Sequence, residues 1–219
     1  MYETYGDLKT LFANKYGEET APSSGVSVRN RFINIASQNI ANREKWEWRK
    51  KQGTGTTDGT RYFSLADDFS ADGFVRHTLE IAGAIWTQIN EGEERKYSGD
   101  SQIFYVIGNR GEGYDVYFPA STPESSLDVV YRYYRDQAVM VSDSDICIIP
   151  SSDAVCDLAV GMYLQSEGDA EEALPFLNAA ENGISELKRI DRRSKARVTF
   201  ENRGTHYGRN VNDIKAMYS

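Results

Sequence analysis

The stretch Gly53-Thr-Gly-Thr-Thr-Asp-Gly59 separates two kinds of hydrophobic pattern in this sequence. Before it, apolar residues recur about every 3.6 positions, which is typical of amphipathic helices. After it, apolar and polar residues alternate, which is typical of half-buried strands. Because glycine-rich polar runs break helices, we interpret the stretch as a turn between a helical part and a β-rich part of the chain.

Two helices are predicted before this turn. Thr4 is suited to cap a short helix that ends at Gly17. A longer helix is predicted from about Ser27 to Trp48, with one apolar stripe made of Val28, Phe32, Ile35, Ala36 and Ile40. Its far end is aromatic and basic.

About six strands are predicted after the turn, at Tyr62–Leu65, Phe74–Ile81, Ala84–Asn90, Ile103–Ile107, Tyr114–Phe118 and Leu127–Tyr134. The run Gly-Asn-Arg-Gly-Glu-Gly at 108–113 supplies residues that tolerate positive φ, as a tight hairpin requires.

Two further helices follow Pro150. The Ser-Ser-Asp run caps the first, which ends at Gly168, and Asp169 opens the second, which ends near Ile190. From Asp191 onward the apolar period is lost. The predicted fold is therefore α+β: a four-helix bundle of two N-terminal and two C-terminal helices, an inserted antiparallel β-sheet domain and an extended C-terminal arm. The predicted boundaries are 1–52, 53–149, 150–190 and 191–219.

The charge of the chain is uneven. Its formal net charge is -8, which disfavours tight binding of DNA and of anionic membranes. The stretch from Lys188 to Arg209, however, holds eight Lys or Arg against two acidic residues, a net charge of +6. We predict that the tail 191–219, which holds most of this basic stretch, is a docking arm that is disordered in the free protein and becomes ordered on assembly.

The two cysteines, Cys147 and Cys156, are too few for a disulfide-stapled secreted protein, so reduced thiols are expected. We found no run that resembles a secretion signal and none long enough to span a bilayer. We therefore expect a cytoplasmic protein without a membrane partner.

No catalytic, cofactor or metal site is predicted. The glycine-rich stretch at 53–59 lacks the Gly-Lys-Ser/Thr ending of a phosphate loop and follows a helix, not a strand. His77 is expected to be a semi-buried strand residue, because it shares a face with Val75 and Leu79 and has no partners at the spacing of a triad or zinc site.

Other polar groups have plain structural interpretations. The acidic pairs Asp67–Asp68 and Asp143–Asp145 fall at element ends, where aspartate favours turns and caps over acid–base chemistry. The aromatic and basic cluster around Trp46 and Trp48 is suited to stack nucleic-acid bases, but such residues are more often core.

Ala159 to Lys188 resembles one tetratricopeptide-like helix pair, but the chain holds no second copy of the repeat. Two alternative functions stay open: a cellular protein-binding module that uses the helix pair 153–190, and a hydrolase that uses His77 with a carboxylate.

Several sequence stretches together resemble the head-to-tail adaptor (connector) proteins of tailed bacteriophages. One is a helix with Arg31 followed by Ile35-Ala36 and ending in Trp-Glu-Trp-Arg-Lys at 46–50. Another, Tyr-Phe-Ser-Leu-Ala-Asp-Asp-Phe at 62–69, is similar to the Tyr-x-Leu-Pro-x-Asp-Phe stretch of such subunits but lacks its proline. The remaining matches are Tyr131-Arg-Tyr-Tyr134, Asp145, Ile149-Pro150, Ala159 and Tyr163. The resemblance covers roughly residues 27–190.

This resemblance implies a structural virion subunit of the phage neck, assembled in the host cytoplasm, with no catalytic residue. It implies a ring, with twelve copies expected, that lies beneath the portal, joins the capsid to the tail and lines the DNA exit channel. The implied partners are the portal protein, tail or nozzle/terminator proteins, further copies of the chain, and DNA that passes without specific binding.

Two groups of residues are predicted to contact these partners. The arm is expected to bind the portal or another partner through Arg192, Arg193, Lys195, Arg197, Phe200, Tyr207, Ile214 and Tyr218. The sheet is expected to face a tail protein or a neighbouring subunit through Tyr105, Tyr114 and Tyr117, because its central hairpin carries more aromatic residues than a small core needs.

Overall fold

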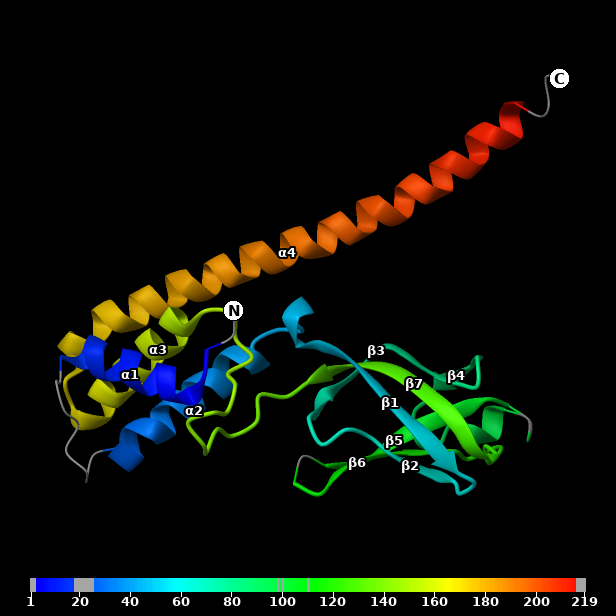
Figure 1. Cartoon of the computed structure of the whole chain (residues 1–219), viewed down its shortest axis with the longest axis horizontal. Helices are drawn as coiled ribbons and strands as arrows, with labels where there is room; N and C mark the ends of the chain where they lie inside the picture. Colours follow the sequence, from blue (N-terminus) through cyan, green and yellow to red (C-terminus); the bar gives the residue numbers. More distant parts are fainter. Residues whose placement is uncertain (1–2, 18–25, 98, 100, 110, 216–219) are drawn as a thin grey trace. The chain divides into compact units, whose positions relative to one another are not determined.

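The computed structural model describes residues 3–17, 26–97, 99, 101–109 and 111–215, and for residues 196–215 it gives the helical backbone. The chain forms two compact units: unit 1 is Met1–Trp48 with Val139–Ser219, and unit 2 is Arg49–Ala138. The described residues form four α-helices and a seven-stranded, mostly antiparallel sheet (Figure 1). The predicted α+β class is confirmed.

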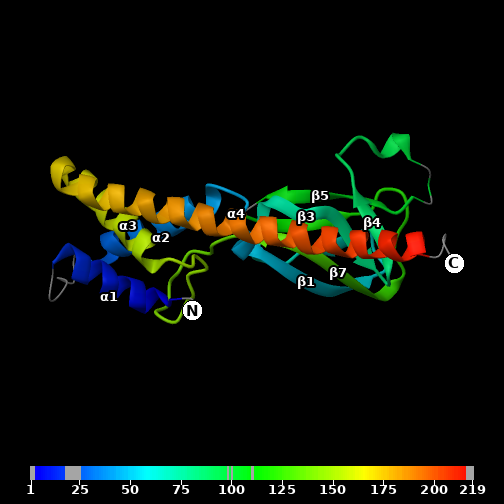
Figure 2. The ribbon, with the colours of Figure 1, turned by 90° about the horizontal axis from the view of Figure 1, so that it is seen from above.

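Unit 1 contains the helices α1 (Tyr5–Tyr16), α2 (Val26–Asn42), α3 (Ser152–Glu167) and α4 (Ala170–Lys215). The helix α3 contacts each of the other three, as Figures 1 and 2 show. Their shared core includes Leu8, Phe12, Ile33, Ile40, Val155, Ala159 and Ile184. The helices of the two chain segments therefore form one hydrophobic core.

The predicted caps of α1 and α3 are confirmed. Thr4 and Asp7 form a capping box at the start of α1, and Gly17 ends the helix in the left-handed conformation. Ser151 caps α3, which ends at Gly168, also left-handed.

Two predicted helix ends are wrong. The helix α2 ends at Asn42, and a 3-10 turn, Glu47–Arg49, follows it. The indole N–H of Trp46 donates to the Ile40 carbonyl at 2.9 Å, so the chain folds back on the end of the helix. The helix α4 does not end near Ile190 but continues to Lys215 over 46 residues, so the backbone predicted to be an extended arm is helical.

Unit 2 contains the strands β1 (Lys50–Asp58), β2 (Tyr62–Ser64), β3 (Phe69–Ile81), β4 (Ala84–Gln88), β5 (Ile103–Asn109), β6 (Gly113–Tyr117) and β7 (Ser125–Arg135). Their order in the sheet is β1-β7-β3-β4-β5-β6-β2. The pair β4–β5 is parallel and the other pairs are antiparallel. The core of unit 2 is rich in aromatic residues and includes Phe69, Phe74, Trp86, Phe104, Phe118, Tyr131 and Tyr133.

The glycine-rich stretch at 53–59 is the main correction to the predicted fold, because all of it except Gly59 belongs to strand β1 and is not a turn. A Cβ at Gly53 would lie 2.3 Å from Cζ of Tyr131, and one at Gly55 would lie 2.9 Å from the ring of Phe63. Two aromatic rings thus occupy the space that side chains of β1 would fill. Phe63 belongs to β2, so the two edge strands of the sheet approach each other here.

The long strand β3 is irregular. Its register against β7 shifts between Phe69 and Phe74 and again between Phe74 and Leu79. His77 lies in the second interval with a φ of 52°, and its side chain is exposed. The expected semi-buried position of His77 is therefore wrong, because the irregularity breaks the alternation on which it rested.

Candidate interaction surfaces

The acidic pairs serve structural roles. Asp68 accepts hydrogen bonds from the Tyr133 hydroxyl and from Lys51 Nζ, the latter at 2.8 Å. Asp145 accepts the backbone N–H groups of Val141 and Ser142 at 2.6 and 2.8 Å, which lowers the pKa of its carboxyl. These contacts match the predicted turn and cap positions.

The other side chains considered for chemistry, His77, Trp46 and Trp48, also have structural contacts. His77 Nδ1 lies 3.1 Å from Gln88 Oε1 on the surface. The rings of Trp46 and Trp48 stack at 5.6 Å, and Trp46 is fully buried, so this pair belongs to the core. Within the described part of the chain, no three His, Cys, Asp or Glu side chains are placed to hold a metal ion.

Both cysteines are buried thiols in the core of unit 1. Burial raises the pKa of Cys147, and it raises that of Cys156 to about 12. Protonated, inaccessible thiols of this kind are inert.

No helix in the described residues is both long enough and apolar enough to cross a membrane.

A row of three tyrosines crosses the outer face of the sheet in unit 2. Tyr117 on β6 pairs with Tyr105 on β5 and with Tyr62 on β2, and its ring centroid is 5.1 Å from each of theirs. Tyr62 is 53% exposed, and the other two are partly exposed. We name Tyr62, Tyr105 and Tyr117 the tyrosine row.

Two of the three predicted sheet residues therefore share a surface, and the third does not. The side chain of Tyr114 lies on the inner face, with its ring 5.4 Å from that of Phe69. The sequence analysis missed Tyr62, although its alternation with the buried Phe63 was a signal that it faces outward.

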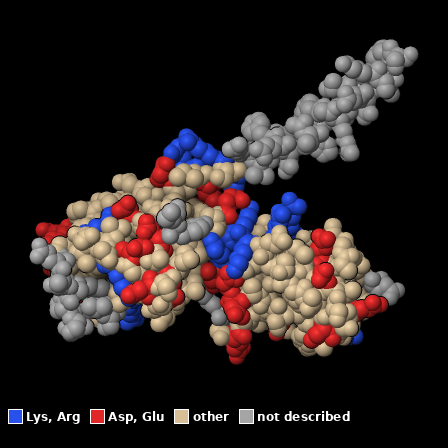
Figure 3. Space-filling view, viewed as in Figure 1, with Lys and Arg blue, Asp and Glu red and all other residues tan. Residues whose placement is uncertain are grey.

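The exposed side of α4 carries a basic patch. Lys188, Arg189, Arg192 and Arg193 line a shallow hollow of about 530 Å³, and Figure 3 shows Lys and Arg gathered just before the grey part of the helix. Lys188 pairs with Glu44 at 3.1 Å, and Arg189 pairs with Glu186. Arg192 and Arg193 are exposed.

Asp191 and Lys195 of α4 form hydrogen bonds with the segment that follows α2. The buried Asp191 accepts the backbone N–H of Glu47 at 2.6 Å and pairs with Lys195 Nζ at 2.6 Å. Lys195 also donates to the Lys45 carbonyl at 3.2 Å. Lys195, predicted to contact a partner, is thus engaged inside unit 1, and we name these contacts the Asp191 anchor.

The other predicted arm residues lie beyond this anchor. Arg197, Phe200, Tyr207 and Ile214 belong to the helical backbone of α4, and their side chains lie outside the described part of the structure. Tyr218 lies outside the described residues.

A groove in unit 1 lies between α2 and the loop 139–146 and has a volume of about 490 Å³. Residues from Asn30 to Gln38 form its helical wall, Val139 and Val141 form the opposite rim, and Met140 points into the protein. The sequence analysis did not find it, although the alternating Val139-Met140-Val141 run is a signal for an extended segment with one buried side chain.

Nearly the whole sequence matches one known protein family. The model described as SU10 adaptor protein matches residues 3–202. The chain belongs to this family of phage head–tail adaptors. The predicted resemblance is thereby confirmed, and the SU10 adaptor match extends from α1 into the distal part of α4. No curated protein matches the sequence.

Proposed function

We propose that this SU10 adaptor is a structural subunit of the phage neck, which assembles into a ring beneath the portal, joins the capsid to the tail and lines the DNA exit channel. The observation that carries the proposal is the family match over residues 3–202. Portal and tail proteins are the partners that an adaptor requires, and twelve is the expected number of copies.

The charge of the chain fits a channel through which DNA passes. Each copy carries a formal net charge of -8, so a ring of copies repels the phosphate backbone. Such a ring guides DNA without retaining it.

Two surfaces are proposed to contact partners. Arg192 and Arg193, exposed on the basic patch, meet an acidic surface of the portal together with the more distal part of α4. The tyrosine row meets a tail protein or a neighbouring subunit, because exposed tyrosines supply large contact areas and hydrogen-bonding hydroxyls at interfaces.

The protein-binding module with a tetratricopeptide-like pair is less well supported. Residues on the inward faces of α3 and α4, such as Ala159, Ala180 and Ile184, are buried in a core shared with α1 and α2. The helix pair therefore uses these faces for the fold and does not offer them to a ligand.

The test is a binding assay with purified portal rings, read by sedimentation and electron microscopy. The free chain is expected to be a monomer or a small oligomer that adds to portal rings as a ring. Arg192→Glu with Arg193→Glu should weaken binding more at low salt than at high salt. A variant that lacks the distal part of α4 should end after Lys195, since a chain that ends earlier would lose the Asp191 anchor and the contacts it makes in unit 1. Portal rings that remain bare at high concentrations of the chain would refute the proposal.

A further inference from the structure

A further hollow, which the proposed function leaves unused, lies on the outer face of the sheet in unit 2. Its volume is about 430 Å³, and it is lined by β1, β7, β3 and β4, none of which carries a residue of the tyrosine row. Arg76 of β3 and Arg132 of β7 are exposed in it, and its lining includes Ile85 of β4, which is 66% exposed. We name this feature the arginine hollow.

The irregularity of β3 places the two arginines opposite each other. At one point of the pairing, β7 has a single residue, Arg132, where β3 has the four residues 75–78, Arg76 among them. His77 in this bulge has a φ of 52°, a left-handed conformation that costs free energy in a residue with a side chain. Its Nδ1 lies 3.1 Å from Gln88 Oε1 on β4, a contact that helps to fix the bulge. Bulges re-aim side chains and are frequent beside functional sites.

The fold itself does not use either arginine. Within the described part of the chain, no hydrogen bond or ion pair involves the guanidinium of Arg76 or Arg132. Arg49 of the same unit, in contrast, is buried and pairs with two aspartates. The lining of the hollow holds these two arginines against one carboxylate, Glu80, a net charge of +1 on a chain of net charge -8. Guanidinium groups without an internal partner are available to carboxylates of another molecule.

The other lining side chains favour a protein over DNA as the occupant. The carboxylate of Glu80 would repel the phosphates of a DNA backbone, which needs a continuous row of cations. Ile85 and Val130 offer apolar contacts, which the core of a protein interface uses. The occupant should therefore combine carboxylates with an exposed apolar side chain.

The start of α4 in unit 1 has this combination. Its first turn holds Glu171 and Glu172. Glu171, Leu174 and Pro175 fall at i, i+3 and i+4, so they share one face of the helix, and all three are exposed. Leu174 is 55% exposed, which is unusual for a large apolar side chain of this protein. We name Glu171, Glu172 and Leu174 the acidic corner.

The carboxylates of the acidic corner also lack partners among the described residues. Acidic groups close to other exposed apolar side chains are engaged. Asp143, two residues from Val141, pairs with Lys9 at 2.6 Å. Glu93, four residues from Tyr97, pairs with Lys96 at 2.6 Å. Acidic side chains in a first turn stabilise the helix through its dipole, but this role leaves their oxygens in solvent, where a guanidinium can reach them.

The acidic corner is rigid before any partner binds. The backbone N–H of Asp169 donates to the Leu164 carbonyl at 3.0 Å and closes the turn between α3 and α4. A Cβ at Gly161 of α3 would lie 2.6 Å from Cδ2 of Leu177, so the two helices are in close contact behind the corner. A preformed surface of this kind loses little conformational entropy on binding.

We propose that the arginine hollow binds the acidic corner of a neighbouring copy, with its two guanidinium groups on the two carboxylates and Ile85 against Leu174. This inference rests on the proposed ring and names one contact between its subunits. Hollow and corner are both exposed in the single chain, so neither satisfies the other there. The contact is heterologous, since the two surfaces differ, and repeated contacts of this kind generate a ring when the rotation closes.

Charge reversal in the full-length chain tests the pairing. One variant carries Arg76→Glu with Arg132→Glu, and the other carries Glu171→Arg with Glu172→Arg. All four side chains are exposed, so both variants should fold, which circular dichroism verifies. Each variant alone should load onto portal rings at least about tenfold more weakly than the parent, because like charges then meet at every contact. A mixture of the two should load as the parent does, since each hollow can meet a complementary corner of the other variant.

Two results would overturn the inference and leave the proposed function intact. One is normal loading of either variant alone. The other is a mixture that loads no better than its components, because the hollow then binds the portal, a tail protein or DNA instead of the acidic corner.

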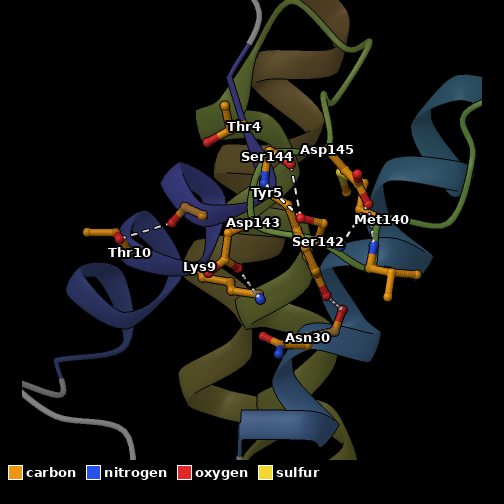
Figure 4. Close-up of polar contacts among 12 residues, drawn as sticks. Thr4, Tyr5, Lys9, Thr10, Asn30, Met140, Ser142, Asp143, Ser144 and Asp145 are labelled. Carbon is orange, nitrogen blue, oxygen red and sulfur yellow. Dashed lines mark hydrogen bonds and ion pairs between the residues drawn. The ribbon is translucent and has the colours of Figure 1, made fainter.

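Disulfide trapping in solution decides the case if even the parent chain does not load onto portal rings. Full-length Ile85→Cys and Leu174→Cys variants are mixed at high concentration and oxidised, and dimers are identified by mass. An 85–174 dimer from two single variants is strictly intermolecular. The native thiols are buried and stay unreactive. The matched control replaces Leu174→Cys with Val141→Cys, an 80% exposed residue on a loop that the ion pair of Asp143 with Lys9 holds to α1 (Figure 4).

The expected result is an 85–174 dimer in several-fold excess over the 85–141 dimer of the control. Equal yields of the two dimers overturn the inference, whatever the outcome of the portal assay.

Discussion

Arg49, the first residue of unit 2, is expected to be its most sensitive position. The guanidinium is fully buried and makes ion pairs with Asp72 at 2.7 Å and Asp136 at 3.2 Å. It also donates to the Ser70 hydroxyl and to the Arg135 carbonyl. One side chain thus connects the chain before β1 with β3 and with the segment after β7, where the chain enters and leaves the unit.

Arg49→Leu should lower the free energy of unfolding of unit 2 by about 3 kcal/mol. Breaking a buried ion pair from one side costs about 3–5 kcal/mol, because the remaining charge stays without its partner. The lower end applies here, since the side chains of Asp72 and Asp136 keep 31% and 15% exposure and so retain some hydration. Arg49→Lys keeps the charge but loses the planar fork, so an intermediate cost is expected.

The assay is urea unfolding combined with hydrogen exchange. Protection should fall in β1, β3 and β7 and persist in α3. Adding Asp72→Asn to Arg49→Leu should cost less than the sum of the two single changes, because both remove the same ion pair. The exposed Arg61→Leu is the matched control and should stay within about 0.5 kcal/mol of the parent. An Arg49→Leu variant within about 1 kcal/mol of the parent would refute the reasoning.

Four further outcomes are expected. The backbone hydrogen bonds that lower the pKa of Asp145 stabilise its loop when the carboxyl is ionised, and this stabilisation is lost as the pH falls below about 4. Amide hydrogen exchange in the loop, corrected for intrinsic rates, should therefore accelerate below that pH, and unchanged protection would contradict this. Asp191→Ala should cost about 1–3 kcal/mol in thermal unfolding, since it leaves a buried N–H without its acceptor, and a neutral variant would show that the anchor is dispensable. Gly53→Ala should cost about 1–3 kcal/mol in urea unfolding, because its Cβ would overlap the ring of Tyr131; parental stability would exclude that overlap. Cys156 should resist thiol reagents at mildly alkaline pH until the protein is denatured, and rapid reaction in the native state would contradict its burial.

The sequence predicted the elements whose signals are local. Thr4, Gly17, Ser151 and Gly168 bound α1 and α3 through backbone hydrogen bonds within a few residues, so their types alone are informative. The six predicted strands are present, with ends shifted by a few residues, because alternation follows directly from one buried sheet face.

What the sequence did not predict depends on partners far along the chain. The glycines of β1 look like a turn, and only the rings of Tyr131 and Phe63 explain them as strand residues. Tyr114 faces the core because of its register on β6, which spacing alone left open. The groove joins α2 to a loop about a hundred residues later, so no local pattern could define it.

The continuity of α4 gives the Asp191 anchor a mechanical role. The helix extends 24 residues past Asp191 to Lys215, a length of about 36 Å. A rotation of about 5° at the anchor would move the far end by about 3 Å, which is most of the heavy-atom distance of about 4 Å at which two side chains are in contact. Small changes at Glu47 or Lys195 are thus amplified with distance, because the contacts of Asp191 and Lys195 are the last described side-chain contacts between α4 and the rest of unit 1.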